Sequence, residues 1–194
     1  MPDADVLPPQ ALPRDAAAII AATRRWLERA VIGLNLCPFA KAVHIKGQIR
    51  YVVTPAQSAD DLRASLADEL ALLAAADPAL HDTTLLVHPW VLRDFHDYND
   101  FLADVEAVVA RLGLEGVLQV ASFHPHYEFA ESTPDDMANF TNRSPYPMLH
   151  LLREASIDRA VAAFPDPAAI FERNIATLRS LGHAGWHQLW VEED

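Results

Sequence analysis

A chain of 194 residues is long enough to bury one hydrophobic core, and 51% hydrophobic with 22% charged residues is the composition of an ordinary globular domain. The formal net charge of -12 opposes a nucleic-acid backbone, and no basic cluster offsets it, so we expect no nucleic-acid partner. No apolar run approaches the roughly 18 residues of a membrane span, so we expect no membrane partner either.

The first 14 residues carry acids and prolines where a signal peptide would carry basic residues and an apolar stretch. We therefore expect a flexible leader over 1–14 and a single α/β domain over 15–194. The single cysteine, Cys37, cannot form an intramolecular disulfide, which is typical of a reducing compartment. This favours a cytoplasmic protein, and the sequence leaves its oligomeric state open.

Apolar residues at three- and four-residue intervals predict a first helix over 15–34. Pro38 disfavours helical backbone at Cys37 and suits the first position of a new helical turn. The sequence therefore predicts that Cys37 is the N-cap of a short second helix.

The middle of the chain alternates between two kinds of segment, one rich in β-branched residues and one with helical spacing. The predicted strands are 49–54, 83–88 and 116–124. The helices between them begin with Ser58 as cap and at about residue 97, and the second ends at Gly113. This βαβαβ order predicts a single layered α/β domain with a central, mostly parallel sheet covered by helices.

The last part of the chain is predicted to add helices to this core. After an irregular segment over 125–146, Pro147 is expected to open a helix through "MLHLLREA". Asp166 and Pro167 are expected to cap and start another helix that ends at Gly182. The tail "WHQLWVEED" fits either an edge strand or the docking of its tryptophans.

Two predicted strands end in His-Pro, at His88 and His124, and ligands of open α/β sheets bind beyond the carboxyl ends of the strands. On an extended chain His124, His126 and Glu128 point to one side, and two imidazoles with a carboxylate suit zinc or iron. These three residues are the predicted metal ligands. Alternatively, His-Pro only marks where the strand leaves the sheet, with its imidazole bonded to a loop carbonyl.

The loop over 129–147 is longer than most connections inside a domain, which favours a functional role. The predicted substrate-binding residues are Asn139, Asn142, Arg143, Ser144 and His150. Arg143 suits an anionic group, because its guanidinium matches a carboxylate or phosphate with two hydrogen bonds. Alternatively, Arg143 pins the loop internally by pairing with Glu131, Asp135 or Asp136.

Cys37 has two interpretations. At a helix N-terminus the thiolate is favoured, which makes a nucleophile, whereas burial against Leu36 and Phe39 makes the thiol part of the core. A nucleophile needs a base within hydrogen-bond reach, and His88, His124, His126 or His150 supplies one only if the fold brings it there. The predicted catalytic residues are Cys37, His88, His124 and His126.

Three segments, "LNLCPFA" (34–40), "SFHPHYEF" (122–129) and "DDMANFTNRSPYPMLHLLRE" (135–154), occur in this order along the chain. They resemble the family of uncharacterised bacterial proteins called domain of unknown function 1415, over nearly the whole chain after the leader. The resemblance implies a single-domain bacterial protein, and it brings no assigned activity, cofactor or catalytic residue.

The sequence alone favours a hydrolase or group transferase that acts on a small anionic metabolite at the carboxyl rim of the sheet. A histidine would activate Cys37 or, if zinc or iron is bound, a metal-bound water would be the nucleophile. Two alternatives stay open. In one the same pocket binds a small ligand without turnover, and in the other the protein is structural and presents the long loop to a partner.

Overall fold

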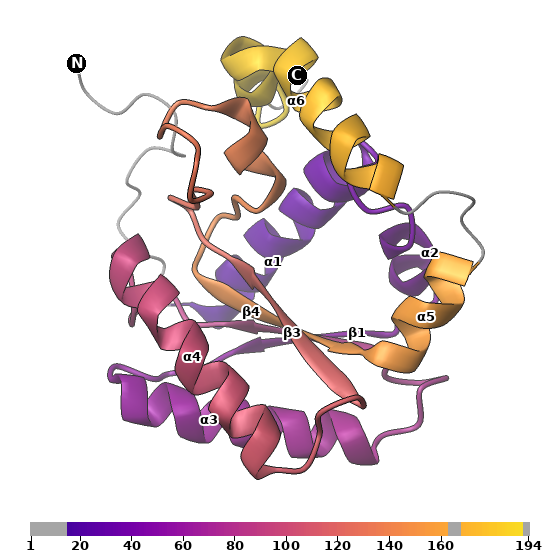
Figure 1. Cartoon of the computed structure of the whole chain (residues 1–194), viewed down its shortest axis with the longest axis vertical. Helices are drawn as coiled ribbons and strands as arrows, with labels where there is room; N and C mark the ends of the chain where they lie inside the picture. The colour runs from indigo at the N-terminus through magenta and orange to yellow at the C-terminus, as the bar shows by residue number, and fades with distance from the viewer. Residues whose placement is uncertain (1–14, 163–167, 192–194) are drawn as a thin grey trace.

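A four-stranded sheet lies at the centre of the molecule, with helices on both of its faces (Figure 1). The computed structural model describes residues 15–162 and 168–191, so the predicted leader, the cap expected at Asp166 and Pro167, and the end of the tail lie outside the described residues. The elements in chain order are α1 (Ala16–Trp26), the π-helix η1 (Leu27–Ile32), α2 (Ala40–Ile45), β1 (Ile49–Val53), α3 (Ala59–Ala75), β2 (Thr83–Val87), α4 (Phe95–Arg111), β3 (Leu118–Phe123), the 3-10 helix η2 (Met137–Thr141), β4 (Met148–Arg153), α5 (Glu154–Ala162) and α6 (Ala168–Gln188).

The predicted βαβαβ segment is present, with the expected cap at Ser58 and the expected glycine at position 113, while α4 begins at Phe95, two residues before the predicted start. The Ser58 side chain accepts a hydrogen bond from the N–H of Asp61 at the start of α3, and Asp94 caps α4 in the same way. Gly113 follows the end of α4 with a φ of 67°, a backbone conformation that suits glycine. The predicted apolar face of α3 is fully buried and consists of Leu62, Leu66, Leu70 and Leu73.

The prediction of a mostly parallel sheet is wrong. The strand order is β1-β2-β4-β3, in which β1 pairs parallel with β2 while β4 pairs antiparallel with both β2 and β3. Because β4 opposes both neighbours, β1, β2 and β3 still point the same way, so their carboxyl ends share one edge as predicted. The sheet is mixed because a strand from later in the chain is inserted between β2 and β3.

The inserted strand is the segment for which a helix was predicted. Its near-continuous apolar run is equally compatible with a short buried helix and a central strand, since periodicity does not separate the two. Packing favours the strand, because Met148 is buried on one face of the sheet and Leu149 and Leu151 on the other. Pro147 lies just before the strand, and its carbonyl accepts a hydrogen bond from the N–H of His88. The helix α5 begins only at Glu154.

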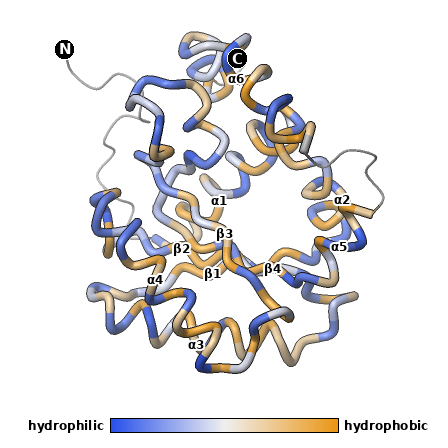
Figure 2. The backbone as a smooth tube through the Cα atoms, viewed as in Figure 1, coloured by the Kyte–Doolittle hydropathy of each residue, from blue (hydrophilic) through white to orange (hydrophobic). Residues whose placement is uncertain are grey.

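Two hydrophobic clusters hold the layers together, one on each face of the sheet. On one face α3 and α4 pack against Leu86, Leu149 and Leu151, and on the other α1, η1, η2 and α6 pack against Val87 and Met148. Figure 2 shows the corresponding concentration of hydrophobic residues along the strands. The two faces are called the α4 face and the α6 face below.

The C-terminal region docks on the α6 face and adds no strand within the described residues. Gly182 takes a φ of 63° and interrupts α6 where the sequence predicted a helix end. Trp186 is buried against Phe140 and Trp190, so docking of the tryptophans is the confirmed alternative for the tail. No helix in the part of the chain that the structure describes has the length and apolar character needed to cross a bilayer.

Candidate functional site

The two histidines of the His-Pro pairs meet at the carboxyl rim of the sheet, on the α4 face. Tyr98 of α4 lies between them, with its ring centroid 5.6 Å from that of His88 and 5.1 Å from that of His124. Both imidazoles are fully buried. The sequence therefore predicted the position of this cluster, which is enclosed by protein on all sides.

The hydrogen bonds of both imidazoles hold the turn between β2 and α4. His88 donates from Nδ1 to the carbonyl of Val91, and His124 donates from Nε2 to the carbonyl of Leu92, at 3.1 and 3.3 Å. Leu92 has a φ of 54°, which is uncommon for a leucine, and this bond helps to hold it there. These contacts match the alternative in which His-Pro marks a strand exit with its imidazole bonded to a loop carbonyl.

Burial keeps both rim histidines neutral. Loss of solvation lowers the pKa of His88 to about 4, and burial together with the nearby His126 lowers the pKa of His124 to about 4. The His124 Nδ1 atom accepts a hydrogen bond from the N–H of His126, so both of its ring nitrogens have partners. The Nε2 atom of His88 is buried, and the described residues give it no partner.

The predicted metal ligands do not form a metal-binding arrangement. His126 is exposed, and both ring nitrogens of His124 are already engaged, Nδ1 by the N–H of His126 and Nε2 by the carbonyl of Leu92, which leaves His124 no lone pair for a metal. Across residues 15–162 and 168–191, no three His, Cys, Asp or Glu side chains are grouped so that they could hold an ion. Zinc or iron at His124, His126 and Glu128 stays a prediction without a supporting geometry.

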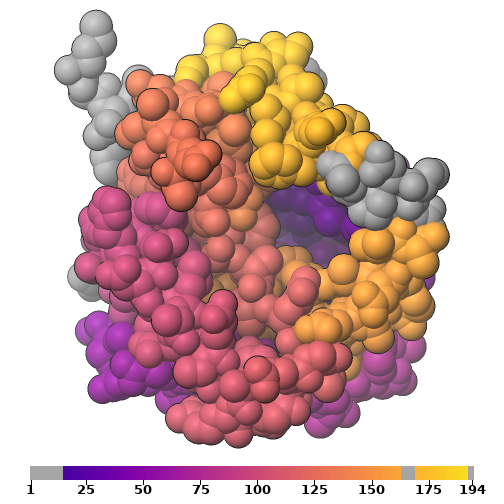
Figure 3. All heavy atoms as spheres, in the orientation of Figure 1, coloured from indigo at the N-terminus to yellow at the C-terminus, as the bar shows by residue number. Residues whose placement is uncertain are grey.

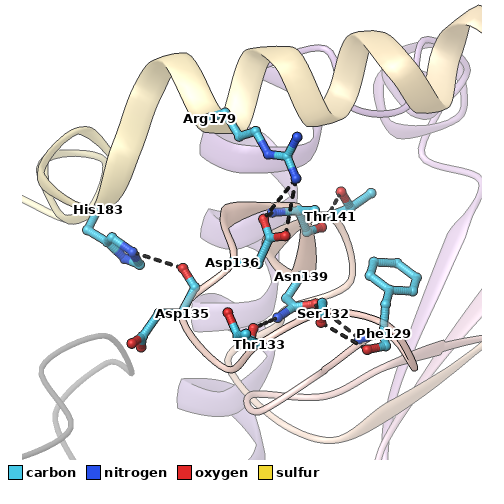
Figure 4. Close-up of polar contacts among 10 residues, drawn as sticks. Phe129, Ser132, Thr133, Asp135, Asp136, Asn139, Thr141, Arg179 and His183 are labelled. Atoms are coloured by element: carbon cyan, nitrogen blue, oxygen red, sulfur yellow. Dashed lines mark hydrogen bonds and ion pairs between the residues drawn. The ribbon is translucent and has the colours of Figure 1, made fainter.

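Asn139, one of the predicted substrate-binding residues, organises the long loop from within. Its Oδ1 atom accepts from the N–H of Phe129 and the hydroxyl of Ser132, and its Nδ2 atom donates to the carbonyl of Thr133 (Figure 4). The side chain is fully buried. The same figure shows Arg179 of α6 paired with Asp136, which fastens the loop to the helix.

Replacing Asn139 with alanine is expected to lower the free energy of unfolding by about 1–3 kcal/mol, because it leaves buried loop donors and acceptors unpaired. Urea unfolding followed by circular dichroism measures the change. Asn99→Ala, the same substitution at an exposed position of α4, is the control and should change stability little. Equal effects of the two substitutions would mean that the Asn139 contacts do not stabilise the loop.

The other predicted loop residues also bond to the protein backbone. The Arg143 guanidinium donates to the carbonyls of Tyr127 and Pro134 and lies 4.2 Å from the centre of the Phe140 ring. Asn142 donates to the carbonyl of Ser122, and Ser144 donates to that of Tyr146. Arg143 thus joins two points of the loop through their carbonyls. Its pairing with Glu131, Asp135 or Asp136 stays a prediction. Its role in binding an anionic substrate stays a prediction.

Cys37 lies on the α6 face, opposite the face of the rim histidines. After η1, Asn35 takes a φ of 55°, and the N–H groups of Leu36 and Cys37 turn back to the carbonyl of Val31. The N-cap of α2 is Phe39, so the prediction that Cys37 caps this helix is wrong. The chain needs two more residues to turn before helical hydrogen bonding begins. The thiol is partly buried and packs against the cluster on the α6 face.

The segment that carries Cys37 is fixed to α6. Asn174, a buried residue of α6, donates to the carbonyl of Leu36 at 2.7 Å, and Arg173 donates to that of Asn35 at 3.2 Å. A short loop that is hydrogen-bonded at two successive carbonyls has little freedom to move. Cys37 is therefore held at a defined place beside α6.

Of the four histidines considered as partners of Cys37, only His150 has its place on the α6 face. It follows Met148 by two residues on β4, and residues two apart on a strand share a face. Its Nε2 atom lies 2.7 Å from the hydroxyl of Thr83, whose own proton goes to the carbonyl of Leu151 at 2.6 Å. The Thr83 oxygen therefore accepts from His150, so His150 carries its proton on Nε2 and has a lone pair on Nδ1.

The ring of His150 is neutral at physiological pH, since burial lowers the pKa of His150 to about 4. The residue is nevertheless partly exposed. The α6 face is less well covered at β3 and β4 than the α4 face, because Phe123, His150 and Leu152 keep partial exposure while Leu149 and Leu151 have none.

Figure 3 shows a hollow on this side of the molecule. It is bordered by α6 in yellow and α5 in orange, and its deep part is formed by the indigo N-terminal region. We call it the α6-face hollow. Cys37, Thr83 and His150 belong to the same face of the sheet as this hollow.

Sequence reasoning missed two residues that shape these sites. Thr83 sets the tautomer of His150, and the Tyr98 hydroxyl joins the start of β4 to the end of β3 by donating to the carbonyl of Met148 and accepting from the N–H of Phe123. Both roles depend on β4 being a strand beside β2 and β3. Because a helix was predicted for that segment, the sequence analysis placed no strand beside Thr83 and Tyr98 and did not identify either residue.

The fold and the site define a layered α/β protein with a mixed sheet that carries His150 and Cys37 on the same face. The family described as "Protein of unknown function (DUF1415)" matches residues 18–188, so the chain belongs to this family and the predicted resemblance is confirmed. No curated protein and no solved structure matches the chain.

Proposed function

We propose that this protein is an enzyme, a hydrolase or group transferase, that uses Cys37 as nucleophile and His150 as general base on a small molecule bound in the α6-face hollow. The observation that carries the proposal is the orientation of His150. Thr83 fixes its proton on Nε2, which leaves the Nδ1 lone pair of a neutral ring as a proton acceptor on the face that holds Cys37.

In the proposed reaction Nδ1 of His150 accepts the thiol proton of Cys37. The sulfur then bonds to an electrophilic carbon of the substrate, the bond to the leaving group breaks, and the imidazolium returns its proton to the leaving group. Water completes a hydrolysis, and another nucleophile completes a transfer, by attacking the same carbon while Nδ1 of His150 takes its proton. The carbon–sulfur bond then breaks, and the Cys37 thiolate leaves and recovers the proton from His150. The thiolate formed in the first step opposes the effect of burial on His150, because a neighbouring negative charge favours the imidazolium.

Alkylation by iodoacetamide tests this proposal, because Cys37 is the only cysteine of the chain and the reaction reports on one site. We expect the folded protein to react between pH 6 and pH 8. His150→Gln should lower the rate at pH 7 by at least about tenfold, since the base that removes the thiol proton is lost. Thr83→Val, which removes the group that fixes the His150 tautomer, should give a smaller decrease and a changed pH profile.

The matched control is His96→Gln, at an exposed position of α4 on the other side of the sheet, and it should leave the rate unchanged. Circular dichroism confirms that each variant is folded. A thiol that reacts only after unfolding in urea, or a His150→Gln variant that reacts like the unchanged protein, contradicts the proposed nucleophile and base.

The packing of Cys37 against the apolar cluster of the α6 face supports a second candidate function, in which the hollow binds a small ligand without turnover. In that case the thiol is part of the core. An inert Cys37 together with ligand-dependent protection of the α6-face residues from hydrogen exchange would favour this function over catalysis.

A further inference from the structure

A second concave site lies at the opposite end of β4 from the rim histidines. It is a pocket of about 210 Å³ beside the start of α5, and its lining includes Gly116, Arg153, Ser156 and Arg159. Arg153 is the last residue of β4 and pairs in register with Leu118, the first residue of β3. The pocket therefore lies at the edge of the sheet where β1, β2 and β3 begin, far along the strands from His88 and His124.

Arg153 is a buried cation, and the hydrogen bonds that it makes within residues 15–162 and 168–191 go to carbonyls, with no acid among them. One nitrogen, Nη2, donates to the carbonyls of Leu73, Ala76 and His81 at 2.5, 2.8 and 3.2 Å. The side chain is only 9% exposed, and its Nε atom is buried without a hydrogen-bond partner in the described part of the chain. Arginine stays charged in proteins, and a buried charge is costly unless an anion compensates it.

The other groups around the pocket suit an anion. Arg159 lines it with a second guanidinium and donates from Nη2 to the Ser156 hydroxyl at 2.9 Å. The pocket lies against the first turn of α5, a nine-residue helix. The N–H of its first residue, Glu154, donates to the carbonyl of Val117 at 3.0 Å, and the N–H groups that follow it in this turn carry partial positive charge. Two acids lie nearby: Asp82 accepts from Ser156 at 2.6 Å, and Glu154 begins the helix. One of these two acids is thus already engaged by the Ser156 hydroxyl.

We propose that this pocket binds a phosphate group, either as inorganic phosphate or as the phosphate of a small metabolite. Arg153 and Arg159 supply the cationic hydrogen-bond donors, and the first turn of α5 supplies backbone N–H groups. A volume of about 210 Å³ is below the roughly 300 Å³ at which pockets begin to hold drug-sized ligands, so the occupant is small. This site is independent of the catalysis proposed for Cys37 and His150.

Titration of the full chain with inorganic phosphate tests the proposal, with isothermal calorimetry and thermal unfolding as readouts. We expect saturable binding with one phosphate per chain and a melting temperature that rises with phosphate concentration. Sodium chloride at matched ionic strength should not reproduce the rise, because a general salt effect does not saturate at one site.

Arg159→Gln is the main variant, because Arg159 is exposed and its loss should leave the fold intact. It should weaken phosphate binding by about tenfold or more, the usual consequence of losing one charge-assisted hydrogen bond. Arg93→Gln, at an exposed position near the opposite edge of the sheet, removes the same charge and should bind phosphate like the unchanged protein. Absence of saturable binding up to 20 mM phosphate, or equal affinities of the two variants, overturns the proposal.

Discussion

Lowering the pH from 7 to about 4.5 is expected to unfold this protein or bring it close to unfolding. Burial lowers the pKa of His88, His124 and His150 to about 4, whereas an unfolded chain holds its histidines near 6.5. Between these two values the unfolded state binds protons that the folded state cannot, so stability is complete above pH 6.5 and falls as the pH drops toward 4.

The expected loss is large. A shift from 6.5 to about 4 corresponds to about 3 kcal/mol for each imidazole, and three of them approach the whole stability of a typical domain, which is about 5–15 kcal/mol. Hydrogen bonds from backbone N–H groups also lower the pKa of the capping residues Asp94 and Asp136. These carboxylates are protonated only below about pH 4, so they do not contribute to the loss of stability between pH 6.5 and 4.5.

Urea unfolding at half-unit steps of pH measures this dependence. His88→Gln, which removes a buried imidazole and keeps a side-chain donor for the Val91 carbonyl, should flatten the curve between pH 6.5 and 4.5 by about one third. His96→Gln removes an exposed imidazole and should leave the slope as it is. If stability stays constant down to pH 4.5, or if the two substitutions flatten the curve equally, the buried histidines are not its cause.

Replacing Phe140 with alanine should be the most damaging single change in the long loop. The ring is 1% exposed and makes edge contacts with Trp186 at 5.0 Å and His183 at 5.6 Å, while the Arg143 guanidinium covers its face. Removing it leaves a cavity between η2 and α6 and removes the ring that the Arg143 guanidinium covers, and we expect a loss of about 3–5 kcal/mol in the free energy of unfolding.

Calorimetry gives the loss, and hydrogen exchange shows where it acts. Backbone amides of 129–142 and of α6 around Trp186 should exchange faster in the Phe140→Ala variant, whereas those of α3 should change least. Phe171→Ala is the matched control, since Phe171 lies on α6 with 54% exposure, and it should cost less than about 1 kcal/mol. A similar cost for both substitutions would show that Phe140 does not fasten the loop to α6.

The sequence was sufficient for the elements whose signals are local. The Ser58 cap, the leucine face of α3 and the glycine after α4 each depend on a few neighbouring residues, and all three are confirmed. The shared edge of His88 and His124 followed from the common direction of β2 and β3. Because these strands remain parallel on either side of β4, this inference held although the sheet is mixed.

The parts that depend on pairing between distant segments were out of reach. The run from Met148 to Leu152 has no period that distinguishes helix from strand, and its place between β2 and β3 is decided by packing on both faces. That error moved His150 to the wrong kind of element and concealed the roles of Thr83 and of the buried Arg153 guanidinium. The separate expectation that Cys37 meets His88 and His124 depended on how distant segments pack, and the sheet lies between Cys37 and these two histidines.

The position of β4 between β2 and β3 has a consequence for the ribosome-bound chain. While residues 148–153 are still unsynthesised, β1 and β2 can pair but β3 has no neighbour, and the backbone groups of β2 and β3 that will bond to β4 are open to other chains. Completion of the sheet must therefore wait until about four fifths of the polypeptide has been made. Until then the nascent chain presents two unpaired strand edges on which a chaperone, or another copy of the chain, can act.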